Sequence, residues 1–107
     1  MFGIKEIEPH GLESLRAQGP VRIIDVRTEA EVAAGFIDGA EHMPLHLLPL
    51  KLNELDPAVP TVFYCRSGAR SGQACAYLAG RGFPNAFNLR GGIIAWMQSG
   101  KSLALAA

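Results

Sequence analysis

The chain has 107 residues, of which 49% are hydrophobic and 19% are charged, and these values fit one globular domain with one core. Ten basic residues balance ten acidic ones, so overall charge favours neither nucleic acid nor a membrane surface as a partner. No apolar run approaches membrane-spanning length, and we expect no signal peptide. Because two cysteines cannot form a disulfide scaffold, we expect a cytoplasmic protein with reduced thiols.

The first elements alternate between strand and helix. Residues 4–8 predict a short strand, and Leu12 and Leu15 have the spacing of a short amphipathic helix that ends at Gly19. Residues 21–26 form a nearly continuous aliphatic run. Such a run is typical of a parallel strand that is covered on both faces.

A capping box predicts the next helix. Thr28 occupies the N-cap position and Glu31 the N3 position, and Gly35 closes the helix. Residues 39–44 predict another short strand. The leucine-rich stretch 45–55 contains prolines and predicts a helical turn or more in an irregular segment.

The second half of the chain continues the alternation. Residues 61–64 predict a buried strand, residues 73–79 a helix and residues 86–89 a last strand. A final helix follows Gly91, and residues 101–107 are expected to form a loosely held tail. This order favours an α/β domain with a mainly parallel sheet, whose active site lies at the carboxyl ends of the strands.

Cys65 lies at such an end, directly after the strand 61–64 and before the helix. A loop between a strand and a helix directs backbone N–H groups at one point, and the helix N-terminus adds partial positive charge. Arg66 and Arg70 add two cations. This environment lowers the pKa of a cysteine, which predicts a nucleophilic thiolate. The alternative is that Cys65 is merely a small buried hydrophobe.

Other polar residues are assigned lesser roles. Asp25 ends the strand 21–26 and is expected to support the loop, with Arg70 as one possible partner. Cys75 is expected in the core, because it lies too far along the helix to reach Cys65. Pro44 lies between His42 and His46, so we expect no metal site.

Four stretches, in register over residues 4–100, resemble the signatures of the rhodanese domain. They are Ile24-Asp25-Val26-Arg27, the stretch from Glu31 through Gly39-Ala40 to Pro44, the loop Cys65-Arg66-Ser67-Gly68-Ala69-Arg70-Ser71, and Asn88-Leu89-Arg90-Gly91-Gly92 followed by Trp96. One departure is Phe36, where many members have histidine. The resemblance implies one rhodanese domain over 1–107, with a five-stranded, mainly parallel sheet flanked by helices on both faces.

The resemblance also implies the chemistry. A sulfurtransferase of this type moves the outer sulfur of a donor such as thiosulfate to cyanide or a thiol, through a persulfide on Cys65. The expected anion cradle consists of Arg66, Ser67, Gly68, Ala69, Arg70 and Ser71. No cofactor, nucleic acid or membrane is expected to take part. Arg27 is expected to form a structural ion pair, and Arg90 either rims the pocket or anchors the last turn.

Three other functions compete with this one. A persulfide carrier would use the same chemistry but deliver its sulfur to a partner protein. A cysteine phosphatase has five residues between its cysteine and arginine, whereas four separate Cys65 from Arg70 here. A non-catalytic docking module of this family usually lacks the cysteine, which this chain keeps.

Overall fold

The computed structural model describes residues 3–106 and contains five strands and five helical segments. In chain order these are β1 Lys5–Ile7, α1 Pro9–Gln18, β2 Arg22–Asp25, α2 Glu29–Ala33, β3 Glu41–His42, the 3-10 segment η1 Leu45–Glu54, β4 Thr61–Tyr64, α3 Ala69–Ala79, β5 Ala86–Leu89 and α4 Gly92–Gln98. Among these residues, no helix combines the length and the apolar character needed to cross a membrane.

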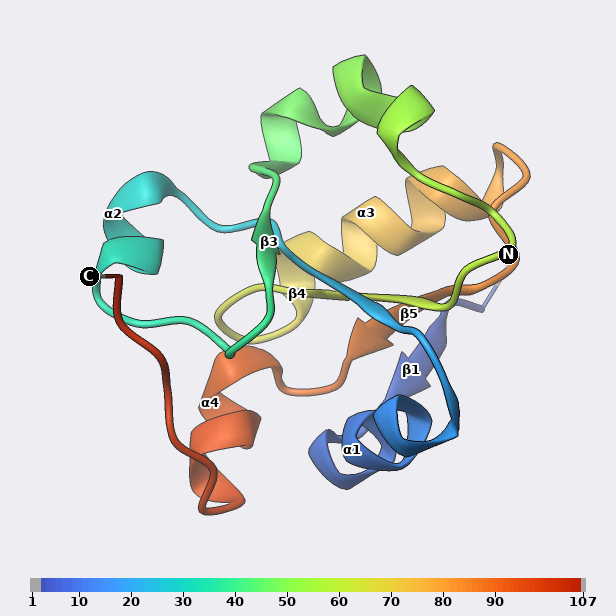
Figure 1. Cartoon of the computed structure of the whole chain (residues 1–107). Helices are drawn as coiled ribbons and strands as arrows, with labels where there is room; N and C mark the ends of the chain where they lie inside the picture. The colour runs from blue at the N-terminus through green and yellow to red at the C-terminus, as the bar shows by residue number, and fades with distance from the viewer. Residues whose placement is uncertain (1–2, 107) are drawn as a thin grey trace.

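The strands form one parallel sheet in the order β1-β5-β4-β2-β3. Helices α3 and η1 lie on one side of the sheet, and α1 and α4 lie on the other (Figure 1). The predicted α/β class, the five-stranded parallel sheet and the helices on both faces are therefore confirmed. Strand β4 is central, so the chain that follows it emerges in the middle of the carboxyl edge.

Two apolar cores explain this arrangement. Side chains of adjacent strand residues point to opposite faces, so Phe63 packs toward α3 and η1 while Tyr64 packs toward α1 and α4. Every residue of β4 is buried. This burial fixes the position of Cys65, whose side chain is 1% exposed and belongs to the α3 side.

Two helices begin earlier than the sequence suggested. Pro9 occupies the first position of α1, ahead of Leu12, and a missing N–H costs nothing there. Helix α3 begins at Ala69 rather than at Gln73, after Gly68 adopts a left-handed conformation with a φ angle of 103°. The second half of the cysteine loop is therefore the first turn of a helix.

The end of the chain is held more firmly than expected. Phe36 and Ala104 form an antiparallel bridge through N–O contacts of 3.0 and 2.8 Å. The Trp96 indole Nε1 donates to the Ser102 carbonyl at 3.1 Å. The prediction of a loosely held tail over 101–107 is thus wrong for the part that meets α4 and Phe36, and its last residue lies outside the described range.

Candidate functional site

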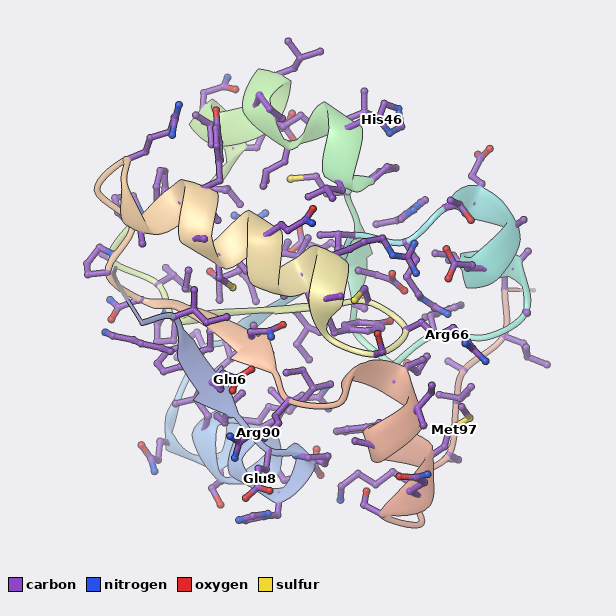
Figure 2. The ribbon with its side chains drawn as sticks, turned by 180° about the vertical axis from the view of Figure 1, so that it is seen from behind. Glu6, Glu8, His46, Arg66, Arg90 and Met97 are labelled. Atoms are coloured by element: carbon purple, nitrogen blue, oxygen red, sulfur yellow. The ribbon has the colours of Figure 1, made fainter. Side chains whose placement is uncertain are left out.

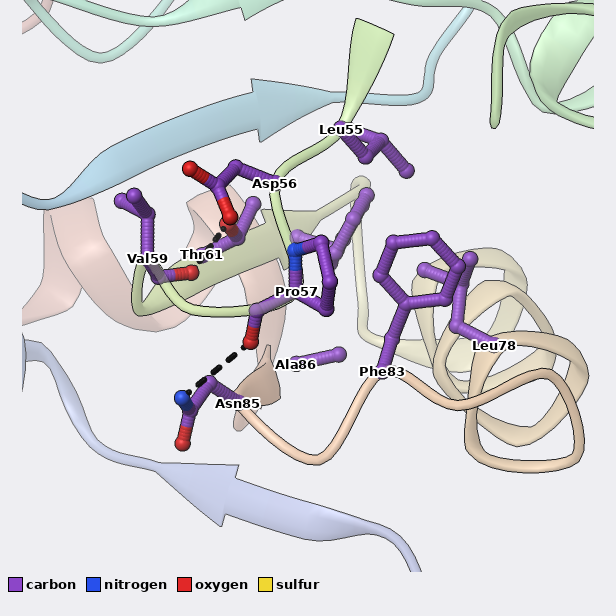
Figure 3. Close-up of a pocket in the computed structure, with 10 residues that line it drawn as sticks. Leu55, Asp56, Pro57, Val59, Thr61, Leu78, Phe83, Asn85 and Ala86 are labelled. Carbon is purple, nitrogen blue, oxygen red and sulfur yellow. Dashed lines mark hydrogen bonds between the residues drawn. The ribbon is translucent and has the colours of Figure 1, made fainter. Parts of the chain in front are cut away.

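A small apolar gap at the amino edge of the sheet is not the site. Thr61 and Ala86, the first residues of β4 and β5, line it together with Leu78 and Phe83 (Figure 3). Its volume of about 10 Å³ holds about one water molecule. Cys65 follows the opposite end of β4, so the gap belongs to core packing.

The Cys65 sulfur sits inside a turn of hydrogen-bond donors. As a thiolate, its Sγ accepts from the Gly68 backbone N–H at 3.1 Å, and from the Ser71 N–H at 3.5 Å and the Ser71 hydroxyl at 3.4 Å. Burial raises the pKa of the Cys65 thiol, but these bonds, together with the Ser67 N–H, outweigh it and lower the pKa below its ordinary value. The arrangement therefore favours a thiolate.

Helix α4 gives the loop its orientation. The N–H groups of Ile93 and Ile94 bind the carbonyls of Cys65 and Arg66 at 3.0 and 3.2 Å. With these carbonyls held by α4, the following peptide units can turn their N–H groups toward the sulfur. Gly92 permits this approach, because a Cβ there would lie 2.4 Å from the Arg66 carbonyl oxygen.

The two loop arginines point to different places. Arg66 is exposed and forms no ion pair among residues 3–106. It lines a hollow of about 320 Å³ with apolar side chains that include Ile94 and Met97. Figure 2 shows Arg66 and Met97 on the same side of the molecule. Arg70 instead forms a two-pronged ion pair with Glu31 at 2.7 and 2.8 Å.

The possible pairing of Asp25 with Arg70 is wrong, because Glu31 binds Arg70. Asp25 does not pair with Arg70. It binds the Arg27 guanidinium, with the closest contact at 2.7 Å, and both side chains are buried. Arg27 also donates to the Gly35 carbonyl at 2.6 Å, so the expectation that Arg27 forms a structural ion pair is confirmed.

The remaining candidates lie outside the turn. Cys75 is a core residue, as predicted, and burial raises the pKa of its thiol to about 12. Arg90 lies beside Glu6 and Glu8 on the β1 side, away from Arg66 (Figure 2). Within the described residues no cluster of three potential metal ligands is present.

Sequence reasoning missed two partners of the loop. The one contact predicted for Glu31 was the capping box, which the structure confirms, yet the same carboxylate also binds Arg70. Asn88, in strand β5, donates its Nδ2–H to the Gly68 carbonyl at 3.1 Å. A polar residue inside the buried strand β5 was the available signal, because buried amides need hydrogen-bond partners.

The Glu31–Arg70 pair predicts an acid-sensitive contribution to stability. The Arg70 hydrogen bonds lower the pKa of Glu31 to about 2. A carboxyl group with a lowered pKa stabilises the fold above its unfolded-state pKa of about 4.3 and loses that contribution as pH falls toward the folded value. We expect Glu31→Gln to reduce the free energy of unfolding by about 1 to 2 kcal/mol at pH 7.

Urea denaturation at pH 7, 5 and 3 measures this contribution. The difference between wild type and Glu31→Gln should narrow between pH 5 and pH 3. Glu29→Gln is the matched control, since Glu29 begins the same helix and is exposed. A difference that stays constant down to pH 3 would contradict the ion pair as its source.

Comparison with known proteins decides the family. The model of the rhodanese-like domain matches residues 8–99. The chain belongs to the rhodanese-like domain family.

Similar proteins agree with this membership. The rhodanese-like chain is 46% identical to a sulfurtransferase of Allochromatium vinosum over 91% of its own length and 92% of the relative's. It is 38% identical to the thiosulfate sulfurtransferase GlpE of Pseudomonas entomophila, over 90% and 87% of the two chains. A crystal structure of a rhodanese-like domain protein from Staphylococcus aureus superposes with a TM-score of 0.86 and 31% identity, covering 97% of this chain and all of that one. These relatives support sulfur transfer as the general activity.

Proposed function

We propose that this rhodanese-like chain transfers a sulfane sulfur from a donor such as thiosulfate to a thiophilic acceptor, cyanide or a thiol, through a persulfide on Cys65. The observation that carries the proposal is the turn of donors around the Cys65 sulfur, from Gly68 and Ser71. Donors placed there favour an anionic sulfur over a neutral one. The name of the GlpE relative supports thiosulfate as the donor.

The reaction has two balanced halves. The Cys65 thiolate attacks the outer sulfur of thiosulfate, a new S–S bond forms, and the old S–S bond breaks with its electron pair leaving on sulfite. The acceptor then attacks the outer sulfur of the Cys65 persulfide, and the electron pair of that bond restores the thiolate. Neither leaving group requires a proton, so the donors of the turn suffice without a general acid.

The position of Arg70 favours sulfur transfer over phosphatase chemistry. A phosphatase needs its loop arginine free to bind a phosphate, whereas Glu31 occupies both prongs of Arg70 here. Arg66 is the loop cation that remains open to an anionic donor. The persulfide carrier that serves a partner protein shares every one of these features and differs only in its acceptor.

Initial rates test the proposal. The thiosulfate concentration is varied at several fixed concentrations of cyanide. A persulfide intermediate then predicts parallel lines in double-reciprocal plots, because sulfite leaves before the acceptor binds. Intersecting lines would indicate that donor and acceptor bind together, and would contradict the proposed cycle.

Arg66→Ala should weaken the use of thiosulfate. Arg66 is exposed, so water and salt screen its attraction for an anionic donor and keep the effect modest. We expect KM for thiosulfate to rise about threefold to fivefold at low salt, with a smaller change in kcat. The difference should shrink as ionic strength increases. Arg81→Ala is the control, since Arg81 lies beyond the end of α3 and stacks on Tyr77. An unchanged kcat/KM for Arg66→Ala would show that this cation does not attract the donor.

A further inference from the structure

A buried side-chain amide lies beneath the cysteine turn. Asn88 of β5 is 2% exposed, and its Nδ2 donates to the Gly68 carbonyl and to Glu6 Oε2, both at 3.1 Å. Both of these groups accept hydrogen bonds, so the nitrogen must face them. The orientation of the amide is therefore fixed, and its oxygen faces Ser71.

The Ser71 hydroxyl has two neighbours but only one hydrogen. Its Oγ lies 2.5 Å from Asn88 Oδ1 and 3.4 Å from the Cys65 sulfur. An amide oxygen accepts and never donates, so the short contact requires the Ser71 hydrogen. Ser71 then presents a lone pair to Cys65, which suits a thiol whose S–H donates to it.

When the sulfur becomes an anion, it requires a hydrogen-bond donor from Ser71 instead of an acceptor. A thiolate carries no hydrogen, so a lone pair of Ser71 aimed at it would be repulsive. Ser71 is fully buried, so bulk water does not supply a replacement donor. A rotation of the hydroxyl would direct its hydrogen to the sulfur and leave Asn88 Oδ1 without this donor.

We propose that Asn88 is a positioning residue that holds the Ser71 hydroxyl hydrogen in the thiol state and releases it to the sulfur when Cys65 becomes anionic. The proton of the thiol leaves to solvent, and the hydroxyl only rotates. Asn88 thus opposes formation of the thiolate, while the backbone N–H groups of Gly68 and Ser71 favour it. This inference deepens the proposed function, but its test measures ionisation rather than transfer, so either can fail alone.

The charged groups around the turn form ion pairs that the test leaves in place. Arg70 binds Glu31 on α2, Arg27 binds Asp25 on β2, and Arg90 lies 3.4 Å from Glu6 on β1. Arg66 is exposed. Among these charged groups, only the Glu6 carboxylate contacts Asn88. Any effect of losing this contact on the pKa of Cys65 should be the same with and without the Ser71 hydroxyl, so it cancels in a double-mutant cycle.

The cycle compares wild type, Asn88→Leu, Ser71→Ala and the double variant, all in a Cys75→Ala background with one thiol. The pH dependence of alkylation by iodoacetamide gives the pKa of Cys65. Asn88→Leu should lower that pKa by about one pH unit when Ser71 is present, and leave it unchanged when Ser71 is alanine. The same change in both backgrounds, or a rise with Ser71 present, would overturn the proposal.

A second measurement needs no substitution at Asn88. The chain contains three asparagines, Asn53, Asn85 and Asn88, so side-chain ¹³Cγ labelling of asparagine gives one probe and two references. The Asn88 signal should move upfield along the Cys65 ionisation curve, because its oxygen loses the Ser71 hydrogen bond, and this movement should vanish in Ser71→Ala. An Asn88 signal that ignores the ionisation, or that moves equally in both proteins, would contradict the release of the hydroxyl.

Discussion

Cys65→Ser is expected to reduce sulfur transfer by about 10³-fold or more, because a serine hydroxyl at neutral pH is neither ionised nor able to carry a persulfide. The fold should persist, since the serine oxygen can accept the same N–H groups of Gly68 and Ser71. Transfer is measured as thiocyanate produced from thiosulfate and cyanide, and folding by urea denaturation.

Cys75→Ala gives the matched control. Cys75 is buried among the apolar side chains of the α3 side, so its loss should cost about 1 kcal/mol of stability and leave transfer intact. The two variants thus separate chemistry from packing. Near-normal transfer by Cys65→Ser would contradict the role of Cys65, and a folded but inactive Cys75→Ala would place a second thiol in the mechanism.

Gly92→Ala is expected to have the largest effect on stability. Gly92 has a φ angle of 61°, and an added Cβ would lie 2.4 Å from the Arg66 carbonyl oxygen and 2.6 Å from the Cys65 carbonyl oxygen. These atoms are backbone and cannot rotate away. We expect the free energy of unfolding to fall by about 3 kcal/mol or more, and transfer to fall with it, because α4 must withdraw from the loop.

Gly80→Ala is the control for this substitution. Gly80 follows α3 with a φ angle of −78°, and the nearest atom to an added Cβ would be 3.7 Å away. The change should be neutral or slightly stabilising. A Gly92→Ala protein as stable and active as Gly80→Ala would show that the contact between α4 and the loop is dispensable.

The fold was predictable where the chain carries a strong local pattern. The aliphatic run of β2 and the buried run of β4 indicate parallel strands, and Thr28 with Glu31 forms the expected capping box. The early start of α3 was not predictable. Its first turn contains residues that favour loops, and Gly68 allows the helix to begin there only because its backbone is left-handed.

The position of Cys65 among hydrogen-bond donors was predictable from the sequence, and the residues that support its loop were less so. Cys65 at the end of a strand and before a helix suggested donors to the sulfur, and the structure supplies them from Gly68 and Ser71. The partners Glu31 and Asn88 could not be assigned, because each lies far from its loop partner in the sequence. Glu31 is 39 residues from Arg70, and Asn88 is 20 residues from Gly68. Such pairings depend on how the strands are ordered in the sheet.

The bridge at the end of the chain was unpredictable for the same reason. Ala104 has no local pattern that indicates pairing with Phe36. Only the close approach of the last segment to the region between α2 and β3 creates that contact (Figure 1).

The most direct test of the account is the mass of the intact protein before and after incubation with thiosulfate, with Cys65→Ser in parallel. We predict a gain of one sulfur atom in the wild type, absent from the variant and removed by cyanide with release of thiocyanate. A wild-type mass that does not change with thiosulfate, nor with a persulfide or mercaptopyruvate donor, would contradict the Cys65 persulfide.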